Sequence, residues 1–137
     1  VGRGIGDIIE KISSKLGMIL LIVNPKIHVN TKEAYAGCII GSEPGGLKNL
    51  IEGLASGDIE KISGFLYNGF EKSVFKNYPE IQQCKEDLKM TGAIGSLMSG
   101  SGSTCFGIYH DVSSARNAEE FFKKKNYFTK VVNTVIR

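Results

Sequence analysis

The chain has 137 residues, of which 42% are hydrophobic and 23% charged, and its formal net charge at pH 7 is +3. This size and composition are those of one globular domain with a hydrophobic core, and they exclude an intrinsically disordered chain. So small a charge does not predict nucleic-acid binding, and no apolar run reaches the roughly 18 residues of a membrane span. We therefore expect neither nucleic acid nor a membrane as a partner.

The cysteines and histidines are widely spaced. Cys38, Cys84 and Cys105 form no CxxC pair, and His28 and His110 stand far apart, so the spacing predicts no metal site. An odd number of unpaired cysteines indicates reduced thiols, and we expect a reducing, cytoplasmic location. Since the sequence opens without a signal peptide or an initiator methionine, we also expect it to continue from a longer polypeptide.

The first third of the chain predicts an extended arm, a buried strand and a short helix. Residues 7–12 alternate polar and apolar side chains, as in an edge strand or an arm. Met18–Val23 is a continuous apolar run that Asn24-Pro25 ends, which favours a central strand. Thr31 is the expected cap of a helix that continues to Ile39.

The middle of the chain predicts helices. Leu47–Leu54 has apolar residues at helical spacing, and Asp58 is placed to cap the next helix. Asn68-Gly69 indicates a turn before a helical stretch at 70–75. Pro79 suits the first position of a further helix.

The last third predicts strand, loop, strand, helix and strand. The strands are expected at 94–98, 104–109 and 127–136, and Ser113 or Ser114 is expected to cap the helix. The element order predicts an α+β fold, a ferredoxin-like (split βαβ) sandwich of about four strands with several helices on one face.

The loop between the two predicted strands is the most informative segment for function. Ser99, Gly100, Ser101, Gly102 and Ser103 alternate hydroxyls with flexible backbone, so their N–H groups could bind a phosphate or another anion. A plain glycine-rich hairpin loop explains the same residues equally well. A Walker loop is excluded because no Gly-Lys-Ser/Thr follows, and a dinucleotide motif is disfavoured because a strand follows the loop.

A second candidate segment, 24–35, follows the predicted central strand. Tyr35 could stack on a planar ligand and Lys32 could contact a phosphate, although a core tyrosine and a surface lysine are the simpler interpretation. His28 has no carboxylate beside it in sequence to orient it as a base. Cys105 lies in an apolar strand and is expected to be buried and inert. We therefore assign no catalytic residue to this chain, which has the inventory of a binding half.

Several segments carry a family resemblance. Ala93–Gly107 resembles the third, C-terminal motif of the GHMP small-molecule kinases. Four further segments, 2–10, 23–35, 68–71 and 78–81, are similar to one branch of that family, which acts on a cytidyl-methylerythritol, and they keep its order along the chain.

The resemblance implies transfer of the ATP γ-phosphate, with Mg²⁺, to the 2-hydroxyl of that substrate in non-mevalonate isoprenoid biosynthesis. It places Thr31, Lys32 and Tyr35 at the cytidine end, where Tyr35 replaces an aromatic that sandwiches cytosine. It places Ser99–Ser103 near the phosphates. Gly69 stands where the branch has an aspartate, which would weaken a helix cap.

The sequence also departs from the family, since it lacks the glycine-rich nucleotide loop and the lysine and aspartate that act on the acceptor hydroxyl. We therefore expect residues 1–17 to join from an N-terminal ATP-binding domain and residues 18–137 to form the C-terminal domain, inactive alone. An apolar docking patch is expected near 98–103 and the 2–6 arm. A GHMP kinase for homoserine, mevalonate or a sugar, or a free-standing ferredoxin-like ligand-binding module, remains the alternative.

Overall fold

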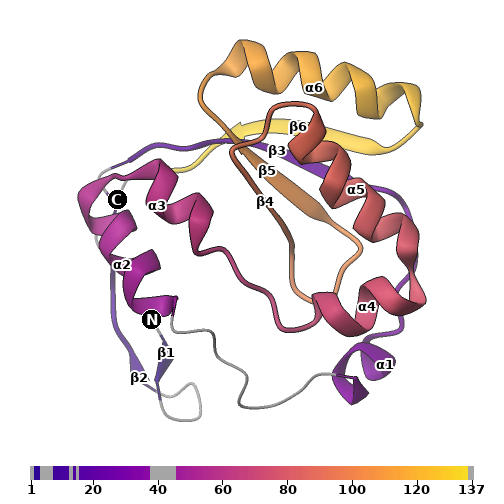
Figure 1. The fold of residues 1–137 in the computed structure, drawn as a ribbon, viewed down its shortest axis with the longest axis horizontal. Helices are drawn as coiled ribbons and strands as arrows, with labels where there is room; N and C mark the ends of the chain where they lie inside the picture. The colour runs from indigo at the N-terminus through magenta and orange to yellow at the C-terminus, as the bar shows by residue number, and fades with distance from the viewer. Residues whose placement is uncertain (1, 4–7, 13, 15, 38–45, 136–137) are drawn as a thin grey trace.

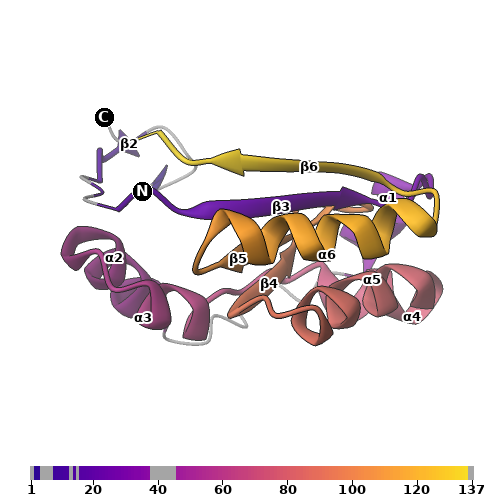
Figure 2. The same cartoon turned by 90° about the horizontal axis from the view of Figure 1, so that it is seen from above.

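A computed structural model (Figures 1 and 2) describes residues 2–3, 8–12, 14, 16–37 and 46–135. Its elements in chain order are β1 (Gly2–Arg3), β2 (Ile8–Ile9), β3 (Ile19–Asn24), α1 (Thr31–Ala36), α2 (Leu47–Ser56), α3 (Ile59–Gly64), α4 (Glu71–Asn77), α5 (Pro79–Met90), β4 (Gly95–Met98), β5 (Cys105–Tyr109), α6 (Val112–Lys124) and β6 (Phe128–Asn133). No helix in these described ranges is long and apolar enough to cross a membrane.

The main sheet has four strands in the order β4-β5-β3-β6, and every neighbouring pair is antiparallel. Strands β3 and β4 therefore run parallel with β5 between them, and β5 and β6 run parallel with β3 between them. This interleaving is the split βαβ arrangement of a ferredoxin-like sandwich, so the predicted fold is confirmed. A separate two-stranded sheet pairs β1 with β2, which agrees with an extended arm before the domain.

The central strand β3 forms where the apolar run predicted it, shifted by one residue to Ile19–Asn24. Leu21 and Val23 are fully buried, and Leu21 lies between Gly107 of β5 and Val131 of β6. Pro25 follows immediately and supplies no N–H to a ladder, so the strand ends there.

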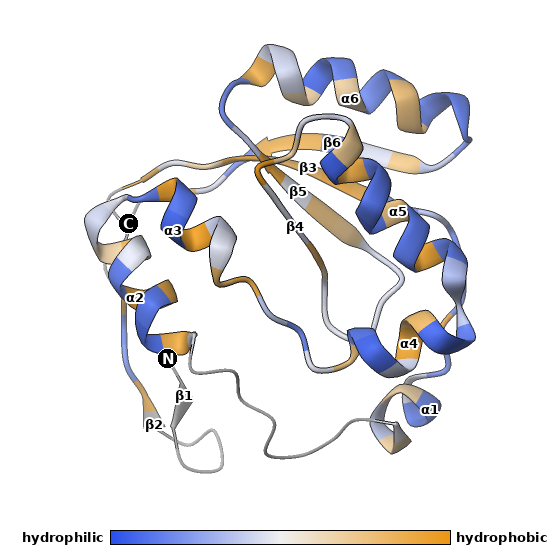
Figure 3. Cartoon of the chain, in the orientation of Figure 1, coloured by the Kyte–Doolittle hydropathy of each residue, from blue (hydrophilic) through white to orange (hydrophobic). Residues whose placement is uncertain are grey.

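Helices α5 and α6 pack on one face of this sheet (Figure 2), and both mix apolar and polar residues along their length (Figure 3), with the apolar ones in the core. Gly107 allows α5 to approach closely, because a Cβ there would lie 3.1 Å from Leu88 Cδ2. Helix α3 approaches β4 at Gly95, where a Cβ would lie 2.8 Å from that of Ser63. The buried core includes Leu21, Val23, Ile81, Cys84, Leu88, Met98, Cys105, Tyr109, Ala115, Ala118 and Phe122.

An ion pair between a buried carboxylate and a partly exposed lysine joins α5 to the end of α6. Asp87, only 2% exposed, accepts hydrogen bonds from Lys125 Nζ at 2.5 Å and from Gln83 Nε2 at 2.9 Å. The carboxylate raises the pKa of Lys125 above its usual range, mainly through that hydrogen bond. This contact fixes the two core helices relative to one another.

Helix α1 begins one residue earlier than the sequence predicted. The cap is Asn30, whose side chain accepts a hydrogen bond from the Lys32 N–H, while Thr31 is already the first helical residue. Both residue types can cap a helix, and the choice depends on which one keeps an extended backbone, as Asn30 does. The expected end at Ile39 lies outside the described residues.

The other predicted helix starts are right with one exception. Asp58 caps α3 through the Lys61 N–H, and Pro79 is the first residue of α5. The cap of α6 is Asp111 rather than Ser113 or Ser114, because the Asp111 carboxylate accepts from both the amide and the hydroxyl of Ser114.

Candidate functional site

The serine-glycine segment, Ser99–Ser103, connects β4 to β5 as the sequence predicted. The Ser99 N–H donates to Thr104 O at 2.8 Å and the Gly102 N–H donates to Ser99 O at 3.0 Å, which close the loop. Gly100 has φ +55° and Gly102 has φ +89°, in the left-handed region that favours glycine. The loop therefore needs glycine at both positions to keep this shape.

The loop also carries polar groups that no other described residue bonds. Within the described part of the chain, the amides of Gly100, Ser101 and Ser103 have no hydrogen-bond partner, and neither do the hydroxyls of Ser99, Ser101 and Ser103. Ser99 and Gly100 are exposed, whereas Ser103 is only 5% exposed. Such a group of free donors on a short turn can bind an anion.

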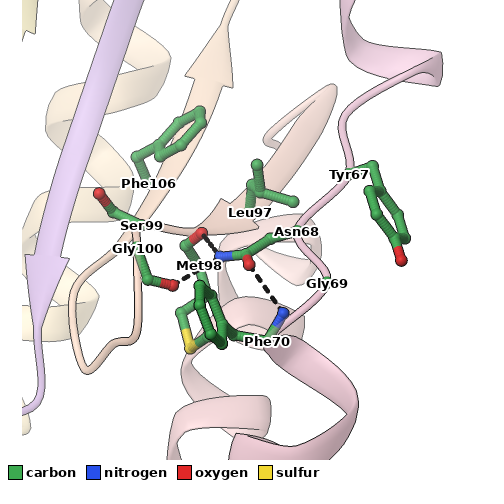
Figure 4. A pocket seen from close by; sticks show the side chains of 9 residues that line it. All are labelled: Tyr67, Asn68, Gly69, Phe70, Leu97, Met98, Ser99, Gly100 and Phe106. Carbon is green, nitrogen blue, oxygen red and sulfur yellow. Dashed lines mark hydrogen bonds between the residues drawn. The ribbon is translucent and has the colours of Figure 1, made fainter. Parts of the chain in front are cut away.

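The entry to the loop is held by Asn68 (Figure 4). Its Nδ2 donates to Met98 O at 2.7 Å and to Gly100 O at 2.8 Å, and its Oδ1 accepts from the Phe70 N–H at 3.0 Å. One amide side chain thus links the end of β4, the loop and the segment that leads into α4.

Glu71, the first residue of α4, bonds the same residue, Met98, through its backbone N–H. Its Oε1 accepts from the Met98 N–H at 2.9 Å, and its Oε2 pairs with Lys85 Nζ at 2.5 Å. The two side chains are mostly buried, with 16% and 20% exposed. The sequence predicts a turn and a family segment here but does not indicate these contacts, which join residues 27 to 32 positions apart.

Beside the loop lies an open hollow of about 450 Å³, and most of its lining is apolar (Figure 4). The residues around it are Tyr67, Asn68, Gly69, Phe70, Leu97, Met98, Ser99, Gly100 and Phe106. The hollow therefore places apolar side chains next to the loop's exposed backbone.

The three α1 residues singled out by the resemblance are all exposed. Lys32 and Tyr35 are three positions apart and Thr31 and Tyr35 four, so they share one side of the helix. Tyr35 is 65% exposed, and its ring makes a T-shaped contact with that of Phe70, with 4.8 Å between ring centroids. The simpler interpretation of Tyr35 as a core residue is therefore wrong, because most of the residue is exposed.

The fold brings the two candidate segments together. Asn24 Nδ2 donates to Thr104 Oγ1 at 2.9 Å, which ties the end of β3 to the end of the loop. A Cβ on Gly102 would lie 3.4 Å from Val29 Cγ2, so the approach to α1 packs against the loop. Phe70 contacts Tyr35 and also lines the hollow beside the loop.

Other candidate groups do not join this arrangement. His28 is exposed and forms no hydrogen bond or ion pair with any described residue. Cys105 is buried as predicted, and a hydrogen bond with Cys84 together with burial raises the pKa of its thiol, so the thiol is inert. In the part of the chain that the structure describes, no three His, Cys, Asp or Glu side chains are grouped to hold a metal ion.

Comparison with protein families agrees with this arrangement. Residues 50–127 match the model of the C-terminal domain of GHMP kinases. The chain belongs to the GHMP kinase C-terminal family. The match includes both helices of the core and the whole loop between β4 and β5.

Curated relatives named 4-diphosphocytidyl-2-C-methyl-D-erythritol kinase resemble the chain over almost its full length. One from Thermodesulfovibrio yellowstonii is 34% identical over 98% of this chain and 48% of its own length. One from Clostridium perfringens is 32% identical over 96% of this chain and 48% of its own. The chain thus spans about half the length of the curated relatives it matches.

Two solved structures share the fold. A 4-(cytidine 5'-diphospho)-2C-methyl-D-erythritol kinase superposes with a TM-score of 0.73 at 23% identity, covering 98% of this chain and 49% of that one. Homoserine kinase from Cytophaga hutchinsonii gives 0.74 at 21% identity, covering 93% and 44%. The fold alone therefore does not separate these substrates.

Proposed function

We propose that this chain is the C-terminal, substrate-binding part of an ATP-dependent kinase that phosphorylates the 2-hydroxyl of 4-diphosphocytidyl-2-C-methyl-D-erythritol. The observation that carries the proposal is the exposed Tyr35 at the same end of the domain as the N–H groups of Gly100 and Ser101, which have no partner among the described residues. The names of the curated relatives support the same substrate.

In this proposal the substrate lies across α1 and the serine-glycine loop. Tyr35 stacks on the cytosine, while Lys32 and Thr31 supply a positive charge and a hydroxyl at the cytidine end. The loop residues Ser99–Ser103 lie near the phosphate site and offer their backbone N–H groups to it. This division fits phosphoryl transfer, which depends mainly on positioning and charge compensation.

ATP and Mg²⁺ belong mainly to the partner of this chain, an N-terminal half that would precede residues 1–17 and dock on the 18–137 domain. The described residues offer no grouped ligands for Mg²⁺, so no step of the reaction is assigned to a metal here. For ATP, the groups that fit a phosphate are the loop amides. A cytoplasmic location remains a prediction of this account.

The test is substrate selection by the complete polypeptide that carries this chain. With ATP, it should phosphorylate 4-diphosphocytidyl-2-C-methyl-D-erythritol and leave homoserine and mevalonate unreacted, because Tyr35 suits a planar base. Homoserine is the sharpest competitor, since a homoserine kinase shares the fold. Turnover of homoserine, or none with the cytidyl substrate, would overturn the proposal.

A further inference from the structure

The segment Asn68–Glu71 contacts both parts of the proposed site from outside the loop. Asn68 and Glu71 hold Met98, the last residue before the loop, and Phe70 between them supports the Tyr35 ring. We propose that Asn68 and Glu71 are positioning residues for the serine-glycine loop and that this segment sets the spacing between the loop and Tyr35. The inference rests on the proposed function for its kinetic consequences only.

Met98 needs these two side chains because it lies in β4, which is at the edge of the sheet. Because β5 is the one strand that β4 pairs with among the described residues, the outward N–H and C=O of Met98 have no neighbouring strand in that part of the chain. Glu71 accepts from that N–H at 2.9 Å, and Asn68 donates to that C=O at 2.7 Å. Two side chains thus replace the missing strand at the point where the chain enters the loop, and they fix the direction in which it enters.

Asn68 also reaches into the loop itself. The same Nδ2 donates to Gly100 O at 2.8 Å, so the peptide group between Gly100 and Ser101 has its carbonyl held by the protein. The N–H on the opposite side of that planar group belongs to Ser101, which has no partner among the described residues. Holding the carbonyl inward therefore directs the Ser101 N–H away from Asn68, available to an anion.

Lys85 makes this arrangement compatible with an anionic ligand. A carboxylate bonded to the residue before the loop would repel a phosphate, but Glu71 is paired with Lys85 at 2.5 Å. Lys85 lies on α5, one of the helices that pack on the sheet, so this ion pair also fixes the Glu71 carboxylate in place. Glu71 thus anchors the loop without leaving an uncompensated negative charge beside it.

The test in the complete kinase uses Asn68→Asp, which keeps the acceptor for the Phe70 N–H but loses both donated bonds. We expect kcat to fall about tenfold to hundredfold, with the KM for the cytidyl substrate within about threefold of wild type. Glu71→Ala should behave alike, whereas Glu71→Gln, which can still accept from Met98, should recover most of the rate. Asn77→Ala and Glu80→Gln, at exposed positions on α4 and α5, are matched controls and should match wild type.

A second measurement needs no activity, namely ¹⁵N relaxation of the 137-residue chain itself. Gly100 and Ser101 should be as rigid as β5 in the wild type and mobile in Asn68→Asp and Glu71→Ala, with β5 unchanged. A rigid loop and wild-type kcat in these variants would overturn the inference. If the wild-type kinase does not use the cytidyl substrate, the proposed function fails and relaxation alone decides the positioning role. If Asn68→Asp does not fold, the contrast of Glu71→Ala with Glu71→Gln decides.

Discussion

The two loop glycines show how single residues fix the shape of the site. Gly100 has φ +55° with open space around an added Cβ, whereas Gly102 has φ +89° and a Cβ there would lie 3.0 Å from Met98 Sδ. The sequence predicted that both glycines free the backbone, but it could not rank them. The difference comes from Met98 and Val29, which pack against Gly102 only in the folded chain.

We therefore predict that Gly102→Ala is the more damaging of two matched substitutions. It should lower the free energy of unfolding by about 2–3 kcal/mol, and Gly100→Ala by about 1–2 kcal/mol. Urea denaturation of the chain measures both. Gly64→Ala, at an exposed position in α3 with nothing near its Cβ, is the control and should cost nothing. Equal stability of Gly102→Ala and wild type would refute this account of the loop.

At the scale of elements, periodicity predicted most helices and strands, and capping residues were the main source of error. Asp58 was identified because it is the one good cap before an apolar helical run. Before α6, by contrast, Asp111, Ser113 and Ser114 all have suitable side chains. Sequence cannot choose among such neighbours, since the choice depends on where the backbone leaves the extended conformation.

The Asp111 cap makes a prediction about pH. Hydrogen bonds from the amide and the hydroxyl of Ser114 lower the pKa of Asp111 below its ordinary value of 3.8. The ionised carboxylate therefore stabilises the fold at neutral pH, and this stabilisation is lost as pH falls through the lowered pKa. Asp111→Ala should lower the Tm at neutral pH. At a pH of about 2 its Tm should lie closer to that of the wild type.

Thermal denaturation at the two pH values measures this effect. Asn117→Ala, an exposed substitution on the same helix, supplies the control and should show the same Tm difference at both. A deficit for Asp111→Ala that stays constant with pH would mean that the carboxylate charge does not hold the cap.

For the whole molecule, the alternation of strands and helices was sufficient to predict the split βαβ sheet. The site was only half predictable. Its loop and Tyr35 lie in recognisable segments, but Asn68 and Glu71 act through contacts with residues some 30 positions away, and no local pattern reports such contacts. Long-range partners of edge strands are set by the tertiary fold, which sequence pattern alone does not specify.

The chain spans about half the length of its curated relatives. We therefore predict that the 137-residue chain alone produces no ADP or phosphorylated product from ATP and the cytidyl substrate. A coupled ADP assay, with the complete polypeptide as the positive control, measures this directly. Turnover by the isolated chain would show that it contains catalytic groups that the site described above does not include.

The most direct measurement is steady-state kinetics of the complete kinase with Tyr35 changed. Loss of a base-stacking ring in Tyr35→Ala should raise the KM for 4-diphosphocytidyl-2-C-methyl-D-erythritol about tenfold to hundredfold. Its kcat should change little, and Tyr35→Phe should resemble wild type because the ring remains. An unchanged KM in Tyr35→Ala would contradict the central claim that this exposed ring and the serine-glycine loop form one substrate site.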